Sequence, residues 1–193
     1  MNIVNVGYRS TNYYVLVDSA PRLLVDAGWP DTLGAMQHTC TRMGLRLADI
    51  PYQLVTHFHP DHAGLCQELK RLGVRLVVVD TQLAGIPLLR IYVKPRDNYV
   101  DLVPEDNIVI SVERSREFLA GIGIEGEILS TPGHSDDCVT LVLDEGIAFT
   151  GDLTPVTMVP QDPSDLAFQS WEKIRATGAP MVYPGHGPAY SLL

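Results

Sequence analysis

Short apolar runs alternate with turn residues along most of this chain of 193 residues. Apolar runs that are partly β-branched and bounded by turns are typical of strands, and they lie at residues 3–8, 13–17, 22–25, 52–56, 75–79, 107–112, 139–143 and 147–150. Apolar residues at helical spacing with a glycine at the end indicate helices, which we predict at residues 31–44, 63–73, 115–121 and 164–177. The pattern therefore predicts a mixture of strands and helices, without internal repeats.

The segment between the strand at 52–56 and the helix at 63–73 has a high density of metal-binding side chains. Three of the six histidines in the chain, His57, His59 and His62, lie here together with Asp61. Imidazole and carboxylate groups are the usual ligands of zinc and of harder divalent ions. A strand-to-helix loop is also where α/β proteins place ligands. We therefore predict a metal site, the alternative being a polar loop whose histidines have no common role.

The spacing within this segment favours two metal ions over one. His57 and His59 are two residues apart, so in extended backbone their side chains lean the same way. Pro60 restricts His59 to an extended conformation. Asp61 and His62 then diverge from the first pair, and one small ion cannot easily take all four side chains.

Three further strand ends carry one potential ligand each. His134 and His186 both follow a short apolar run and a Pro-Gly turn, and Asp152 follows the strand at 147–150. Proline and glycine make a tight turn that leaves the next side chain pointing out from the strand end. We therefore expect these residues to complete the metal site. His38 lies within the predicted helix at 31–44, and we interpret it as a surface or packing residue.

The order His-x-His-x-Asp-His at residues 57–62, then His134, Asp152 and His186, resembles the metallo-β-lactamase-fold hydrolase superfamily. The resemblance runs from Val25 to Gly187 and implies an α/β fold, a four-layer αββα sandwich of two mixed β-sheets. A length of 193 residues fits a single domain over residues 1–193. Within the superfamily, the chain resembles the glyoxalase II-like and lactonase-like branch. A C-terminal helical extension of the glyoxalase II type is not expected here.

The resemblance also implies a division of the ligands between two divalent ions. His57, His59 and His134 would hold the first ion, Asp61, His62 and His186 the second, and Asp152 would bridge them with a water or hydroxide. Asp61 would also be catalytic by orienting the nucleophile. Asp26 resembles an aspartate that orients a ligand histidine, the alternative being a turn residue. Mixed imidazole and carboxylate ligands suit zinc, iron and manganese alike, and of these we expect two zinc ions, with iron and manganese as alternatives.

Composition narrows the class of substrate. The net charge is −9, and the 14 Lys and Arg residues are scattered, which argues against a nucleic-acid partner. No apolar run approaches the roughly 20 residues needed to span a bilayer, so we expect no membrane partner. The N-terminus lacks the pattern of a signal peptide, and we expect a cytoplasmic protein. Three cysteines without paired spacing argue against a disulfide scaffold; Cys66 is expected in the core, and Cys138 either in the core or at the site.

Two segments near the ligands leave alternatives open. Residues 81–103 are apolar and basic together, which fits a lid or substrate-binding loop in which Tyr92, Lys94 or Arg96 meets an anionic substrate. A helix covering the sheet and a homodimer contact fit the same pattern. In residues 135–137, two acidic side chains follow His134, and they either tune the metal ligands or cap a turn.

These inferences predict a hydrolase in which a metal-bridging hydroxide attacks a small ester, thioester or lactone. One alternative is a phosphodiesterase with the same metals and an anionic substrate. A second alternative is an iron-dependent redox enzyme such as a sulfur dioxygenase. The residues determine the type of reaction more closely than they determine the small-molecule substrate.

Overall fold

The computed structural model describes residues 1–192 and contains two mixed β-sheets. The first sheet has six strands in the order β1-β2-β3-β4-β5-β6. These strands are β1 (Asn2–Asn5), β2 (Tyr14–Val17), β3 (Pro21–Val25), β4 (Tyr52–Leu54), β5 (Arg75–Val79) and β6 (Ile108–Ile110). Pairing is antiparallel from β1 to β3 and parallel from β3 to β6.

The second sheet has five strands in the order β11-β10-β9-β8-β7. These strands are β7 (Gly126–Ser130), β8 (Val139–Leu143), β9 (Ile147–Gly151), β10 (Met181–Pro184) and β11 (Tyr190–Ser191). The strands β9 and β10 run parallel, and the other neighbours in this sheet are antiparallel. The hairpin predicted from residues 139–150 is confirmed as β8 and β9.

Each central strand is apolar on both faces because it separates two cores. In β5, Val77 and Val79 pack between the two sheets, whereas Leu76 and Val78 pack against the helices outside the first sheet. In β8, Leu141 faces the first sheet and Val142 packs towards α6. This alternation follows from the two-residue period of a strand, and it predicts a helical layer outside each sheet.

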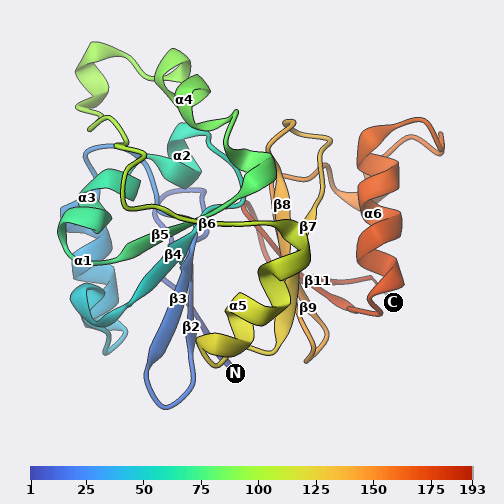
Figure 1. The fold of residues 1–193 in the computed structure, drawn as a ribbon, viewed down its shortest axis with the longest axis horizontal. Helices are drawn as coiled ribbons and strands as arrows, with labels where there is room; N and C mark the ends of the chain where they lie inside the picture. The colour runs from blue at the N-terminus through green and yellow to red at the C-terminus, as the bar shows by residue number, and fades with distance from the viewer. Residues whose placement is uncertain (193) are drawn as a thin grey trace.

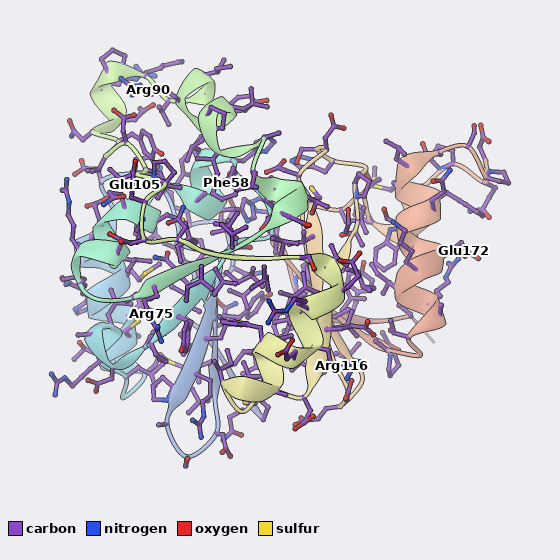
Figure 2. All side chains as sticks on the ribbon, viewed as in Figure 1. Phe58, Arg75, Arg90, Glu105, Arg116 and Glu172 are labelled. Carbon is purple, nitrogen blue, oxygen red and sulfur yellow. The ribbon has the colours of Figure 1, made fainter. Side chains whose placement is uncertain are left out.

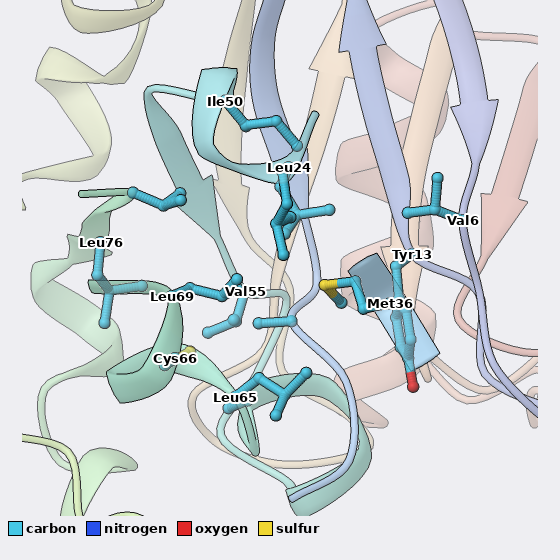
Figure 3. Close-up of a cluster of buried hydrophobic side chains, with 14 of the residues drawn as sticks. Val6, Tyr13, Leu24, Met36, Ile50, Val55, Leu65, Cys66, Leu69 and Leu76 are labelled. Carbon is cyan, nitrogen blue, oxygen red and sulfur yellow. The ribbon is translucent and has the colours of Figure 1, made fainter. Parts of the chain in front are cut away.

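The helices form these two outer layers (Figure 1). The first sheet is covered by α1 (Leu33–Arg42), α2 (Pro60–Ala63), α3 (Cys66–Arg71) and α4 (Ile86–Tyr92), and the second by α6 (Leu166–Ala176). The helix α5 (Ser115–Gly121) packs against β7, and short 3₁₀ turns lie at Leu47–Asp49, Asp80–Gln82, Pro95–Asp97, Val112–Arg114 and Val156–Met158. The predicted four-layer αββα sandwich is confirmed. Figure 3 shows the core under α1 and α3, where Cys66 packs beside Leu65 and Leu69 as expected.

The structure differs from the predicted elements in two places near the site. The strand predicted at residues 3–8 ends at Asn5, because the chain then turns tightly and Tyr8 pairs with Thr11. The helix predicted at 63–73 is divided into α2 and α3 at Gly64. A side chain at Gly64 would collide with Pro30, so this position packs backbone against the neighbouring loop. Both departures place backbone close to the ligand segment.

Within residues 1–192, none of the helices combines the length and the apolar character needed to cross a bilayer.

Candidate metal centre

The structure brings all seven predicted ligands together at the ends of four strands. They form two groups in which one ligand atom from each residue lies within 4.8 Å of the others. The first group, the His57 cluster, contains His57, His59 and His134. The second group, the His62 cluster, contains Asp61, His62, Asp152 and His186. The division between the clusters matches the division that the resemblance implies, apart from Asp152, which the geometry groups with the second set.

Buried oxygen atoms fix the orientation of two of the histidine rings. His62 Nδ1 lies 2.9 Å from Asp26 Oδ2, and His57 Nδ1 lies 3.1 Å from Thr56 Oγ1. Thr56 Oγ1 can donate its proton to Asp26, which leaves its lone pairs to accept from His57 Nδ1–H. Both rings then turn Nε2 towards the cluster. Asp26 is therefore the orienting residue that the resemblance implied.

The turn at residues 8–11 holds the His62 cluster from the opposite side. His186 Nδ1 donates to the carbonyl oxygen of Ser10 at 2.7 Å, and Thr11 Oγ1 donates to Asp61 Oδ2 at 3.2 Å. The remaining nitrogen of His186, Nε2, lies 3.2 Å from Asp61 Oδ2. His57, His62 and His186 thus share one arrangement, with Nδ1 bound to an oxygen and Nε2 turned inward, which is how histidines are held in metal sites.

Asp152 lies between the two clusters. Its Oδ1 is 3.2 Å from His62 Nε2, and its Oδ2 is 3.3 Å from His186 Nε2 and 3.8 Å from His134 Nε2. The close approach depends on Gly185, where an added Cβ would lie 2.6 Å from both Asp152 Oδ1 and His62 Cε1. The two carboxylate oxygens of Asp152 are therefore placed to serve both clusters.

Burial and charge act in opposite directions on the titration of the cluster. Burial lowers the pKa of His57 well below its ordinary value, and the neighbouring imidazoles add to this effect. Burial also acts to lower the pKa of His62, but the carboxylates of Asp26, Asp152 and Asp61 outweigh it and hold that pKa well above its ordinary value. Contacts with His62 in turn lower the pKa of Asp61 to about 2, against the effect of burial. The cluster therefore carries negative charge that a cation can balance.

Three buried polar atoms of the clusters lack a hydrogen-bond partner, and a bound divalent ion would take that place. His57 Nε2, His62 Nε2 and Asp152 Oδ1 are buried and lack a hydrogen-bond partner, although His62 Nε2 and Asp152 Oδ1 lie close together. Buried polar atoms are rarely left without a partner, because each such atom costs free energy. All three belong to the two clusters, and imidazole nitrogen and carboxylate oxygen suit zinc, iron and manganese alike. The donor set and its geometry therefore fit a pair of divalent cations.

Asp137 connects the segment after His134 to the ligand loop. Its Oδ2 accepts a hydrogen bond from the backbone N–H of Phe58 at 2.7 Å, and its Oδ1 accepts one from Ser135 Oγ at 2.6 Å. Figure 2 shows Phe58 inside the molecule, below the α4 segment, whereas Arg90 lies at its outer edge. Asp137 thus caps its own turn, as one alternative predicted, and it also fixes the backbone between His57 and His59.

Replacing Asp137 with alanine should lower the free energy of unfolding by about 2–3 kcal/mol, because Phe58 N–H would remain buried without an acceptor. Asp137→Asn retains one oxygen for Phe58 and should lose roughly half as much. Urea denaturation at equal metal content measures the difference. Asp136→Ala is the neighbouring control and should change stability by less than about 0.5 kcal/mol, since Asp136 is exposed. Equal losses at 136 and 137 would contradict this role.

A cavity of about 360 Å³ opens beside the His57 cluster. It is lined by His59 and His134, by residues 135–137, and by Thr81, Ala84, Gly85, Leu88 and Tyr92 from the 81–103 segment, with Phe58 at its base. The ring of Tyr92 stands edge-on to His59, with 4.8 Å between ring centroids. Tyr92 therefore contacts the candidate site from α4, so a helix covers this side of the first sheet, and the contact of Tyr92 with a substrate stays a prediction.

Lys94, Arg96 and His38 lie away from the cavity and the two clusters. Lys94 and Arg96 follow α4, are exposed, and do not line the cavity. His38 is exposed on α1, in agreement with its interpretation as a surface residue. Cys138 is buried and contacts Ser135 Oγ at 3.1 Å, but it does not line the cavity, so the core alternative holds for it.

Sequence patterns missed the roles of Ser10 and Thr11. In the sequence they lie between the strands predicted at 3–8 and 13–17 and match no ligand pattern. Their partners, His186 and Asp61, are 176 and 50 residues distant in the chain. A backbone carbonyl such as that of Ser10 carries no signal in the sequence, so only the fold reveals this support.

Comparison with known proteins identifies the family. The family model described as the metallo-beta-lactamase superfamily matches residues 6–186. This chain belongs to the metallo-beta-lactamase superfamily.

Individual relatives agree with this assignment. A beta-lactamase-like protein 2 homolog of Drosophila melanogaster is 32% identical over 93% of this chain and 59% of its own length. An atrochrysone carboxyl ACP thioesterase of Aspergillus fumigatus is 31% identical over 93% of this chain and 51% of its own length. The chain thus spans between half and three fifths of these two curated relatives.

Solved structures share the fold. A metallo-beta-lactamase family protein from Thermus thermophilus, TTHA1429, superposes with a TM-score of 0.75 at 23% identity, over 98% of this chain and 74% of the other. TTHA1623, solved in a di-iron-bound form, superposes with a TM-score of 0.71 at 24% identity, over 100% of this chain and 95% of the other.

Proposed function

We propose that the protein is a dinuclear metal-dependent hydrolase that acts on a small ester, thioester or lactone. The observation that carries this proposal is the pair of adjoining ligand clusters with Asp152 between them. Membership of a superfamily that contains thioesterase-named and lactamase-like relatives supports hydrolysis as the class of reaction. We keep cytoplasmic location and a small-molecule partner as parts of the same proposal.

In this proposal each cluster holds one ion. His57, His59 and His134 would bind the first, and Asp61, His62 and His186 the second. Asp152, whose oxygens approach histidines of both clusters, would bind both ions. Zinc is the favoured ion, and the di-iron form of TTHA1623 supports keeping iron beside manganese as an alternative.

The two ions, when bound, would supply a water of lowered pKa and an electrophile for the carbonyl oxygen. The protein residues then hold the reactants. Thr11 fixes one oxygen of Asp61, so that this carboxylate can orient the attacking water. The cavity beside His59 and His134 would receive the substrate.

Esters and thioesters fit the site better than phosphodiesters. No lysine or arginine lines the cavity, whereas a phosphodiester brings negative charge that usually needs one. The name of the Aspergillus fumigatus relative supports thioesters among the carbonyl substrates.

Metal analysis of freshly purified protein followed by a substrate panel tests the proposal. We expect two divalent ions per chain, and hydrolysis of an aryl thioester, an aryl ester or a lactone that a chelator abolishes and added zinc restores. Preference for an aryl phosphodiester would instead support the phosphodiesterase alternative. A single bound iron with oxygen consumption would support the redox alternative, and either result would contradict the proposal.

A further inference from the structure

The cavity beside the His57 cluster has two unlike walls. The helix α4 contributes one wall, formed by Leu88 and Tyr92. The segment after His134 contributes the other, formed by residues 135–137. Phe58 and His59 also line the cavity, and because His59 belongs to the His57 cluster, the cavity adjoins the candidate metal centre.

The wall from α4 is apolar and open. The helix packs on the core through Leu89, which is buried, and through Ile86. Leu88 and Tyr92 are four residues apart and therefore lie on one face of the helix. Leu88 remains 47% exposed and Tyr92 55% exposed. Large apolar side chains left open at the mouth of a cavity gain free energy when a ligand covers them.

The opposite wall carries one carboxylate without a partner. Both oxygens of Asp137 are engaged by Phe58 and Ser135. Asp136 is exposed, and within residues 1–192 no hydrogen bond or ion pair engages its carboxylate. Since no lysine or arginine lines the cavity, this charge is not balanced there by a basic side chain. A free carboxylate on the wall attracts cations and repels anions in any bound group.

We propose that this cavity binds the acyl part of the substrate and that Asp136 selects it by charge. Apolar acyl groups that are uncharged or end in an ammonium group are accepted, and acyl groups that end in a carboxylate or phosphate are rejected. This inference rests on the proposed function and specifies its substrate class. It reverses the expectation that Lys94 or Arg96 meets an anionic substrate, because neither residue lines the cavity.

Three thioesters of equal acyl length, ending in a methyl, an ammonium or a carboxylate group, test this selection with the protein carrying its metals as purified. The wild type should favour the methyl and ammonium substrates over the carboxylate substrate in kcat/KM. Asp136→Asn should raise kcat/KM for the carboxylate substrate about tenfold and lower it for the ammonium substrate by a similar factor, as expected for one charge pair near a protein surface. The methyl substrate should change less than about twofold.

A matched control separates local from general electrostatics. Asp18→Asn removes the same charge from the β2–β3 turn, at the opposite end of the molecule from α4 (Figure 1). The Asp18 carboxylate is exposed and approaches only Arg22, at 3.6 Å. This variant should leave the ratios of kcat/KM among the three substrates at the wild-type values. Equal effects at positions 18 and 136 would overturn the assignment to the cavity.

Binding measurements keep this inference distinct from the proposed function. Ketone analogues, in which a methylene group replaces the thioester sulfur, resist hydrolysis and can be titrated by calorimetry. The wild type should bind the methyl and ammonium analogues more tightly than the carboxylate analogue. Asp136→Asn should tighten binding of the carboxylate analogue and weaken binding of the ammonium analogue, even if no thioester is hydrolysed. A wild type that binds the carboxylate analogue as tightly as the methyl analogue, or an Asp136→Asn variant with unchanged ratios, would overturn the inference while leaving hydrolysis of neutral substrates untouched.

Discussion

Asp152→Ala should bind fewer than two metal ions per chain and lower kcat/KM for thioester hydrolysis by about a thousandfold or more. Asp152 is the only carboxylate in the described structure whose oxygens approach histidines of both clusters, His134 on one side and His62 and His186 on the other. Without it, the proposed dinuclear site would lose its shared anionic ligand. Two ions bound there would together supply several kcal/mol of transition-state stabilisation, which corresponds to this loss of rate.

Elemental analysis and steady-state kinetics on the same sample measure both effects. Asp49→Ala is a suitable control, because Asp49 is exposed on the 3₁₀ turn at Leu47–Asp49, and within residues 1–192 its carboxylate forms an ion pair with Arg46 alone, at 3.7 Å. The control should retain full metal content and full activity. An Asp152→Ala variant that retained both properties would contradict the assignment of Asp152 as a bridging ligand.

Asp26→Asn should lower the free energy of unfolding by about 3 kcal/mol and weaken metal binding at the His62 cluster about 10- to 100-fold. Asp26 is buried, and its two oxygens accept from Thr56 N–H, Thr56 Oγ1 and His62 Nδ1. An asparagine tolerates the left-handed backbone at this position, where φ is 66°. In asparagine, however, an NH₂ group replaces one of the two acceptor oxygens. One of the three donors then stays buried without an acceptor.

The effect on stability should depend on pH in the metal-free protein. Asp26 contributes to raising the pKa of His62, so their interaction stabilises the fold fully below the ordinary histidine value of about 6.5. It is lost as the pH rises through the raised pKa of His62. Urea denaturation across this range should therefore show the largest difference between wild type and Asp26→Asn at the acidic end.

Asp31→Asn is the matched control for Asp26→Asn. Asp31 also has a left-handed backbone, with φ of 62°, but it is exposed and accepts only from Asn98. Its replacement should cost less than about 0.5 kcal/mol and leave metal binding unchanged. If the two variants lost equal stability and retained equal metal affinity, Asp26 would not orient His62 in the way its contacts indicate.

The ligand residues could be predicted from the sequence because each follows a short strand. In the second sheet β7, β9 and β10 run in the same direction, so the residues that follow them, His134, Asp152 and His186, meet at one edge. The outer helical layers were implied by strands such as β5, whose residues are apolar on both faces. Local patterns therefore indicated the inventory of the candidate site, whereas the arrangement of the two sheets was implied by the family resemblance.

The supporting contacts could not be predicted because they join distant segments. The hydrogen bond between Asp137 and Phe58 joins residues that are 79 positions apart, and the one between Ser10 and His186 joins residues that are 176 positions apart. Neither contact has a periodicity or a motif. The early end of β1 at Asn5 has the same origin, since the turn that follows is held by contacts with Asp61 and His186.

The sequence also could not show which side chains of the 81–103 segment reach the cavity, and hence which charge a substrate meets there. Basic residues beside apolar ones suggested an anionic substrate, but α4 presents Leu88 and Tyr92 to the cavity, whereas Lys94 and Arg96 follow the helix and are exposed. The burial of Leu89 sets the register of α4 and places Leu88 and Tyr92 at the cavity, and α4 ends before Lys94. The free acidic group there, Asp136, comes from a different segment.

Titration of metal-stripped protein with zinc, with bound metal and thioester hydrolysis measured on the same samples, tests the proposed dinuclear hydrolase most directly. We predict that hydrolysis is absent without metal and rises to its maximum as the bound zinc reaches two ions per chain. Full hydrolysis in the metal-stripped protein, or saturation with zinc that leaves every ester, thioester and lactone intact, would contradict the proposal.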